Sequence, residues 1–160
     1  MSTDVTRVYA SFLQKISDYK FNEDLEYVES TLFGYYTTAT AEFVQCQKDL
    51  GTNYDGLSDK PDKVLINADL TQLEIEILAM LMLVEYFKQI MIRNETIEQA
   101  LSDSDFKILS QANHINQLKD LWKEVRKETS VKINKYTFVG AVYDKKWETI
   151  RTIFQREKCK

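Results

Sequence analysis

Chain-breaking residues are scarce in this sequence, and that scarcity limits the folds open to it. Only four glycines and one proline occur among the 160 residues. Many short strands joined by tight turns need more of both residues, whereas long helices need few. Hydrophobic residues make up 44% of the chain and charged residues 29%, the balance of a globular protein. We therefore expect a mainly α fold, a helical bundle.

Hydrophobic spacing indicates where the helices lie. Apolar residues recur every three or four positions, which predicts helices over about residues 4–18, 22–44, 72–92 and 104–133, with a break or kink near Gly34 and a short helix at 96–101. The 72–92 segment follows a capping-box sequence at Thr71 to Glu74 and is apolar around most of its circumference, so it is the long central helix. The long C-terminal helix has a narrow stripe, which predicts that it lies on other helices and is partly exposed. Its members are Ile108, Gln111, Ile115, Leu118, Trp122, Val125, Thr129 and Lys132.

Two segments favour extended structure. Turn-forming residues between Gly51 and Asp62 predict a long loop, with a short extended stretch at Val64 to Ile66 after it. Residues 136–143 alternate with a period of two, which predicts a short β arm that pairs either with Val64 to Ile66 or with another chain. We therefore divide the chain into a helical body, 1–135, and a C-terminal arm, 136–160, of one strand and a short helix. The candidate contact residues on this arm are Tyr136, Phe138, Tyr143, Trp147 and Phe154.

Charge is unevenly distributed along the chain. Residues 1–100 contain 8 basic and 17 acidic residues, a net charge of −9, whereas residues 101–160 contain 13 basic and 8 acidic residues, a net charge of +5. Opposed charges of this kind fit association of copies head to tail. The alternative is neutralisation within one chain, with the basic residues on solvated helix faces.

The sequence contains no arrangement of residues that is typical of a catalytic, metal or cofactor site. His114 is the sole histidine, Cys46 and Cys159 lie far apart, and no glycine-rich phosphate loop occurs. We expect no catalytic site, metal or cofactor, and we interpret the methionines as core residues. The apolar run at 75–92 contains three charged residues, and no secretory signal is evident, so we expect a protein made in the cytoplasm without a membrane span.

Several short motifs occur together in one order. In that order, over about residues 5–135, the chain resembles the small head–tail connector (neck adaptor) proteins of tailed bacteriophages that infect Gram-positive hosts. The motifs are FLQKISDY at 12–19, AEF at 41–43, CQKDL at 46–50, DLT at 69–71, EIEILA at 74–79, LSDSDF at 101–106 and SQANHI at 110–115.

The resemblance implies a virion structural protein located in the neck. Such proteins form a ring, commonly twelvefold, that binds the portal protein on one side and the next neck or tail protein on the other. Genomic DNA passes through the ring without sequence-specific contact. Two alternatives stay open: another tail-completion or baseplate structural protein, and a small regulator that binds nucleic acid through the basic and aromatic residues of 132–160.

Overall fold

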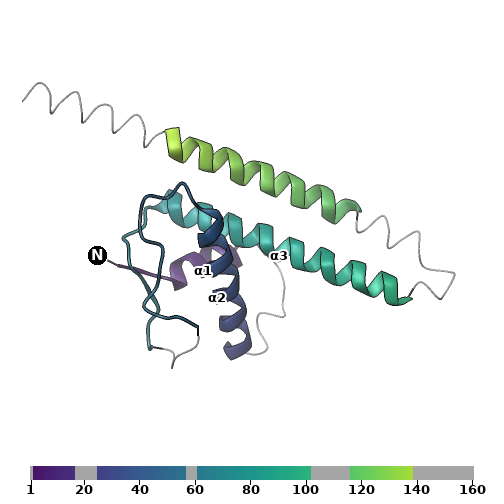
Figure 1. Cartoon of the computed structure of the whole chain (residues 1–160), viewed down its shortest axis with the longest axis horizontal. Helices are drawn as coiled ribbons and strands as arrows, with labels where there is room; N and C mark the ends of the chain where they lie inside the picture. The colour runs from purple at the N-terminus through teal and green to yellow at the C-terminus, as the bar shows by residue number, and fades with distance from the viewer. Residues whose placement is uncertain (1, 17–24, 57–60, 102–115, 139–160) are drawn as a thin grey trace, which may run out of the picture.

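The computed structural model describes residues 2–16, 25–56, 61–101 and 116–138 (Figure 1). Helices dominate these residues and a small two-stranded sheet accompanies them, so the expected mainly α fold class is confirmed. A final described helix covers residues 116–138 and is called the 116–138 helix below. The labelled elements, in chain order, are β1 (Thr3–Asp4), α1 (Thr6–Leu13), α2 (Leu25–Glu42), β2 (Leu65–Ile66) and α3 (Gln72–Leu101).

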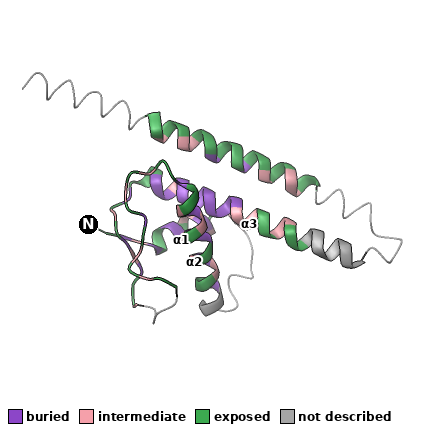
Figure 2. Cartoon of the chain, in the orientation of Figure 1, coloured by how far each residue is buried: buried purple, intermediate pink, exposed green. Residues whose placement is uncertain are grey.

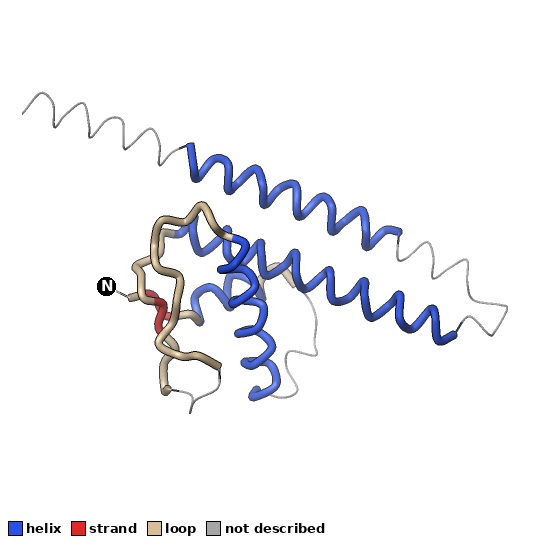
Figure 3. Tube along the Cα trace, in the orientation of Figure 1, coloured by secondary structure: helices blue, strands red, loops and turns tan. Residues whose placement is uncertain are grey.

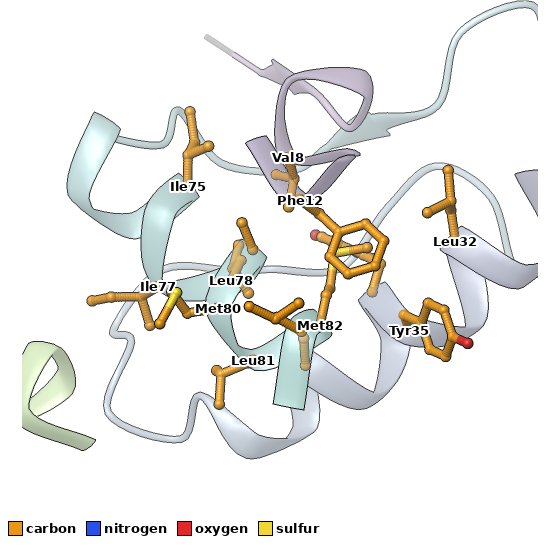
Figure 4. Packing of buried hydrophobic residues seen from close by; sticks show 14 of the residues in the cluster. Val8, Phe12, Leu32, Tyr35, Ile75, Ile77, Leu78, Met80, Leu81 and Met82 are labelled. Carbon is orange, nitrogen blue, oxygen red and sulfur yellow. The ribbon is translucent and has the colours of Figure 1, made fainter. Parts of the chain in front are cut away.

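The hydrophobic core lies where α1 and α2 pack against the first half of α3 (Figure 4). Phe12 of α1 is at its centre, with its ring centroid 6.0 Å from those of both Tyr35 and Tyr86. Aromatic rings tilted at these distances add attraction to the burial of their surface. Figure 4 shows side chains from all three helices converging here: Val8, Phe12, Leu32, Tyr35, Ile75, Ile77, Leu78, Met80, Leu81 and Met82.

Helix α3 extends well past the body that surrounds its first half. It is buried almost continuously from Ile75 to Val84 and becomes exposed toward Arg93, as the change of colour in Figure 2 shows. The 116–138 helix runs back along α3 in the opposite direction (Figure 3), because its late residue Lys132 contacts Glu76 near the start of α3. The two helices therefore form a long antiparallel hairpin, one end of which rests on the body.

The sheet ties the start of the chain to the segment that precedes α3. Strands β1 and β2 pair antiparallel, with Thr3 opposite Ile66 and Asp4 opposite Leu65. The Thr3 hydroxyl also accepts a buried hydrogen bond of 2.7 Å from the amide of Leu70. The extended stretch predicted at Val64 to Ile66 is thus confirmed at Leu65 and Ile66, which pair with the N-terminal strand, and Ile66 also forms an antiparallel bridge with Thr52.

Several predicted boundaries are wrong for physical reasons. The first helix begins at Thr6, because residues 3 and 4 pair with β2. The second continues through Gly34, so a break there is excluded, and the hydroxyl of Thr38 donates a 3.1 Å hydrogen bond to the Gly34 carbonyl within this helix. The segment predicted as a separate helix at 96–101 is the end of α3.

The predicted β arm needs the largest correction. Residues 136–138 are helical and end the 116–138 helix, so the strand prediction is wrong for them. The Tyr136 ring packs edge-on against Phe43, with centroids 5.3 Å apart, and a continued helix carries it there. The remaining arm residues, 139–143, lie outside the described residues, as do 104–115 of the predicted long helix.

Replacing Phe12 with alanine tests the core. Because Phe12 is buried between α2 and α3, we expect Phe12→Ala to lower the free energy of unfolding by about 3–5 kcal/mol in urea titrations followed by circular dichroism. Val44 is 80% exposed, so Val44→Ala should change that free energy by less than about 0.5 kcal/mol. Equal effects from the two substitutions would contradict this account of the core.

Candidate functional site

A buried carboxylate marks the place where the 116–138 helix meets the body. Glu74, in the first turn of α3, is only 1% exposed. Its Oε2 accepts hydrogen bonds from the amide and the hydroxyl of Thr71, at 2.6 and 2.9 Å, and the Thr71 hydroxyl accepts one from the Glu74 amide. This is the reciprocal capping box that the sequence predicts. The carboxylate therefore has a local reason to lie at this turn.

Two distant residues complete the surroundings of Glu74. Lys48 Nζ donates to Oε2 at 2.7 Å, and the Tyr136 hydroxyl donates to Oε1 at 3.0 Å. The same hydroxyl lies 3.8 Å from Cys46 Sγ. We call Glu74, Thr71, Lys48 and Tyr136 the Glu74 clamp. It joins the start of α3, the segment after α2 and the last turn of the 116–138 helix.

The clamp fixes the protonation state of its members. Burial, the largest influence, raises the pKa of Glu74, but hydrogen bonds from Lys48, Thr71 and Tyr136 together lower that pKa below its ordinary value. Burial and then the hydrogen bond to Glu74 raise the pKa of the Tyr136 phenol. The carboxylate thus stays ionised and the phenol stays protonated around neutral pH. Such a pair holds two elements together and provides no group that exchanges protons near pH 7.

A second carboxylate, Glu76, lies two residues further along α3 and forms another bridge to the 116–138 helix. Its Oε1 lies 3.0 Å from Lys132 Nζ, and its Oε2 lies 2.9 Å from Lys15 Nζ and accepts a hydrogen bond from Ser11. Lys132 also pairs with Glu128, one turn earlier in its own helix. The contact between Lys132 and Glu76 neutralises a basic residue of the chain's second part with an acidic residue of its first part. Intrachain neutralisation, one of the two alternatives for the uneven charge, therefore occurs at this point.

An apolar stripe on the 116–138 helix faces the body beside these polar contacts. Val125 and Thr129 are buried, and the Thr129 hydroxyl donates to the Val125 carbonyl at 2.7 Å. Trp122, Ile133 and Tyr136 are partly buried against the same core. The predicted stripe is therefore confirmed from Trp122 to Lys132.

The predicted contact residues have separate environments. Tyr136 is half-buried and belongs to the clamp. Phe138, two residues later, is 77% exposed. Tyr143, Trp147 and Phe154 lie outside the described residues.

Sequence reasoning missed the partners of the two glutamates. It interpreted Glu74 only as a capping residue and Glu76 only as an interruption of an apolar run. One signal was available in the sequence. Tyr136 follows Lys132 by four residues and Thr129 by seven, so it continues the stripe of the helix that faces α3.

Searches for ligand sites and known relatives provide no assignment. Among the described residues, no group of three or more His, Cys, Asp or Glu side chains is arranged to hold a metal ion. No helix in those same ranges has both the length and the apolar character needed to cross a bilayer. No family model, curated protein or solved structure matches the chain.

Removing one hydroxyl tests the clamp. We expect Tyr136→Phe to lower the free energy of unfolding by about 1–3 kcal/mol, because the buried Glu74 charge loses a donor while the ring contact with Phe43 remains. Hydrogen exchange should become faster in residues 116–138 in particular. Tyr35→Phe removes a hydroxyl bonded to Gln89 and is the matched control, which should leave exchange in residues 116–138 as it is. Unchanged protection of that helix in Tyr136→Phe would refute the clamp.

Acid should weaken the hairpin's attachment. For Glu76, burial raises the pKa, yet its bonds to Lys15 and Lys132 leave that pKa below the ordinary value; the pKa of Glu74 is lowered too. A lowered pKa contributes stability in full above the unfolded-state value of about 4.3 and loses it as pH falls through the folded-state value. We expect the urea concentration at the unfolding midpoint to decrease as the pH is lowered below about 5. The decrease should be smaller in Glu76→Gln. Glu42→Gln, at an exposed glutamate, should reproduce the unmodified curve; a Glu76→Gln curve of the same steepness would contradict this assignment.

Proposed function

We propose that this chain is a structural subunit of the neck of a tailed bacteriophage, a head–tail connector that forms a ring between portal and tail. The proposal rests on the ordered motifs that resemble neck adaptors and on the geometry at the end of the 116–138 helix. Its partners are copies of itself, the portal protein and the next neck or tail protein, and DNA passes through the ring. The described residues that carry it bind other proteins and perform no chemistry.

The contrast between Tyr136 and Phe138 is the observation that supports this proposal most. The clamp holds Tyr136 against the body through Glu74 and Phe43. Phe138 nevertheless leaves a large apolar ring 77% exposed on the last described turn. Aromatic residues are enriched among those that contribute most to protein interfaces, and exposure of one costs free energy in an isolated chain. The helix thus presents Phe138 from a fixed position.

The body supports the proposal because it needs no partner to complete its core. Its three helices bury a continuous apolar cluster, from Val5 and Val8 through Phe43 to Val84. The hairpin, in contrast, extends past that cluster and exposes Ile92 and Leu121 at 55% and 41%. A folded body with a projecting hairpin is an arrangement that suits a subunit of a larger assembly.

Truncation after residue 138 and substitution of Phe138 test the proposal. Because Tyr136 belongs to the clamp, removing residues 139–160 keeps every described contact, and circular dichroism should still report a folded helical protein. We expect the truncated chain to lose binding to the portal protein of the same phage, measured by co-sedimentation with portal rings. Phe138→Ala in the full chain should weaken that binding at least about tenfold.

Val44→Ala is the matched control for Phe138→Ala. Val44 is 80% exposed, close to the exposure of Phe138, but it follows α2 on the body. It should bind portal rings as the unmodified chain does. Full-strength binding by the truncated chain, or equal losses from both alanine variants, would overturn the assigned role of this end. Absence of any binding by the unmodified chain would overturn the connector proposal itself.

A further inference from the structure

The outward side of the 116–138 helix carries two parallel rows of opposite charge. Its inward side is occupied by Val125, Thr129, Lys132 and Tyr136, which contact the body. On the other side, acidic and basic residues each recur at intervals of four. We call Asp120, Glu124 and Glu128 the acidic row, and Lys119, Lys123 and Lys127 the basic row.

Helix geometry sets the two rows on different flanks. Residues four apart lie almost above one another, whereas neighbours in sequence are turned by about 100°. Each lysine precedes an acidic residue by one position, so the basic row follows one flank of the outward side and the acidic row follows the other. A helix of this kind is complementary to a copy of itself: the acidic flank of one copy fits the basic flank of the next.

Four residues of the two rows, Asp120, Lys123, Glu124 and Lys127, are exposed, whereas Lys119 is half-buried and Glu128 pairs with Lys132. The side chains of Asp120 and Lys123 are 77% and 69% exposed, although their charged atoms lie 3.2 Å apart. Exposed pairs of this kind contribute little to stability, so exchanging such a contact for one with a neighbouring molecule costs little. Glu124 and Lys127 are also exposed.

Apolar surface accompanies the acidic row. Val131 is 44% exposed and follows Glu124 by seven residues, which places it on nearly the same line along the helix. Burying Val131 at a contact adds a favourable contribution that charge alone does not supply. The acidic flank thus combines charge with an apolar side chain.

We infer that copies of this chain contact each other through the 116–138 helix, with the acidic row of one copy against the basic row of the next. The inference rests on the proposed ring and specifies its subunit contact. When each copy uses its acidic row toward one neighbour and its basic row toward the other, the contact is heterologous and passes from copy to copy, as a ring requires. The partner at this surface is a second copy of the same chain.

A row-exchanged variant separates this arrangement from general charge attraction. It carries Asp120→Lys, Lys123→Glu, Glu124→Lys and Lys127→Glu, so its net charge is unchanged. All four positions are exposed, and the variant should fold with an unaltered circular dichroism spectrum. In the variant, two of the three residues in each row have exchanged their charge with the other row. Copies of the variant should therefore associate with one another. When a variant chain meets an unmodified chain, residues of like charge should face each other and weaken the contact.

Carbodiimide cross-linking, which joins a carboxylate directly to a lysine amine that contacts it, detects the proposed contact. Unlabelled and ¹⁵N-labelled full-length chains are mixed at low salt, with and without portal rings. The mixture is then cross-linked, and its peptides are analysed by mass spectrometry. Two unmodified chains should give mixed-isotope peptides that link the acidic row to the basic row, and these links should diminish at high salt. Unmodified chains mixed with the row-exchanged variant should lose them. Absence of row-to-row links between unmodified chains under both conditions, or their persistence with the variant, overturns the inference.

The control variant moves the same number of charges on the body. It carries Arg7→Glu, Glu42→Lys, Asp62→Lys and Lys63→Glu, all at exposed positions and without a change in net charge. It should couple to the unmodified chain through the rows as the unmodified chain couples to itself, and a loss equal to that of the row-exchanged variant counts against the rows. Portal binding is measured separately, so a failed row test leaves the connector proposal standing. Row-to-row links without portal binding overturn the connector proposal alone.

Discussion

The ionised Glu74 carboxylate is the constraint on which the described arrangement depends. A buried charge is costly unless donors surround it, and removing one donor leaves the charge uncompensated. The donors to Glu74 come from Thr71 at the start of α3, Lys48 after α2 and Tyr136 at the end of the 116–138 helix. Moving any of these segments away would leave the Glu74 charge without one of its donors, so each segment is held in place. The hairpin has a fixed angle to the body because Glu74, which caps α3, also accepts the hydrogen bond from Tyr136 of the 116–138 helix.

Support for the hairpin decreases with distance from this point. Val125 and Thr129 are buried against the body's side of the hairpin, whereas Trp122 is partly buried and its Nε1 has no hydrogen-bond partner among the described residues. Arg126 lies over the Trp122 ring, with its guanidinium carbon 5.1 Å from the ring centroid. The body thus determines where the hairpin starts, and side chains along the hairpin itself govern its outer part.

Local signals in the sequence were reliable, and long-range ones were not. The Thr71 to Glu74 capping box lies within one turn and predicts the start of α3 correctly, and the stripe from Trp122 to Lys132 identifies the buried face. The β1 strand was missed because two residues carry no period and their partner lies over sixty positions away. Alternating aromatic residues favoured a strand at Tyr136, but contacts with Phe43 and Glu74 override that preference. Tyr136 and Phe138 were named as site residues, whereas their contrasting roles depend on Glu74, 62 positions from Tyr136.

The length of α3 has a mechanical consequence. The body surrounds its first half, and the remaining residues, from Glu85 to Leu101, make a rod about 25 Å long at about 1.5 Å per residue. A tilt of about 5° at the edge of the body displaces the far end by about 2 Å, because displacement grows with distance from the pivot. The second helix of the hairpin stiffens this rod. A small change of angle near the body is thereby magnified into a larger movement at the opposite tip.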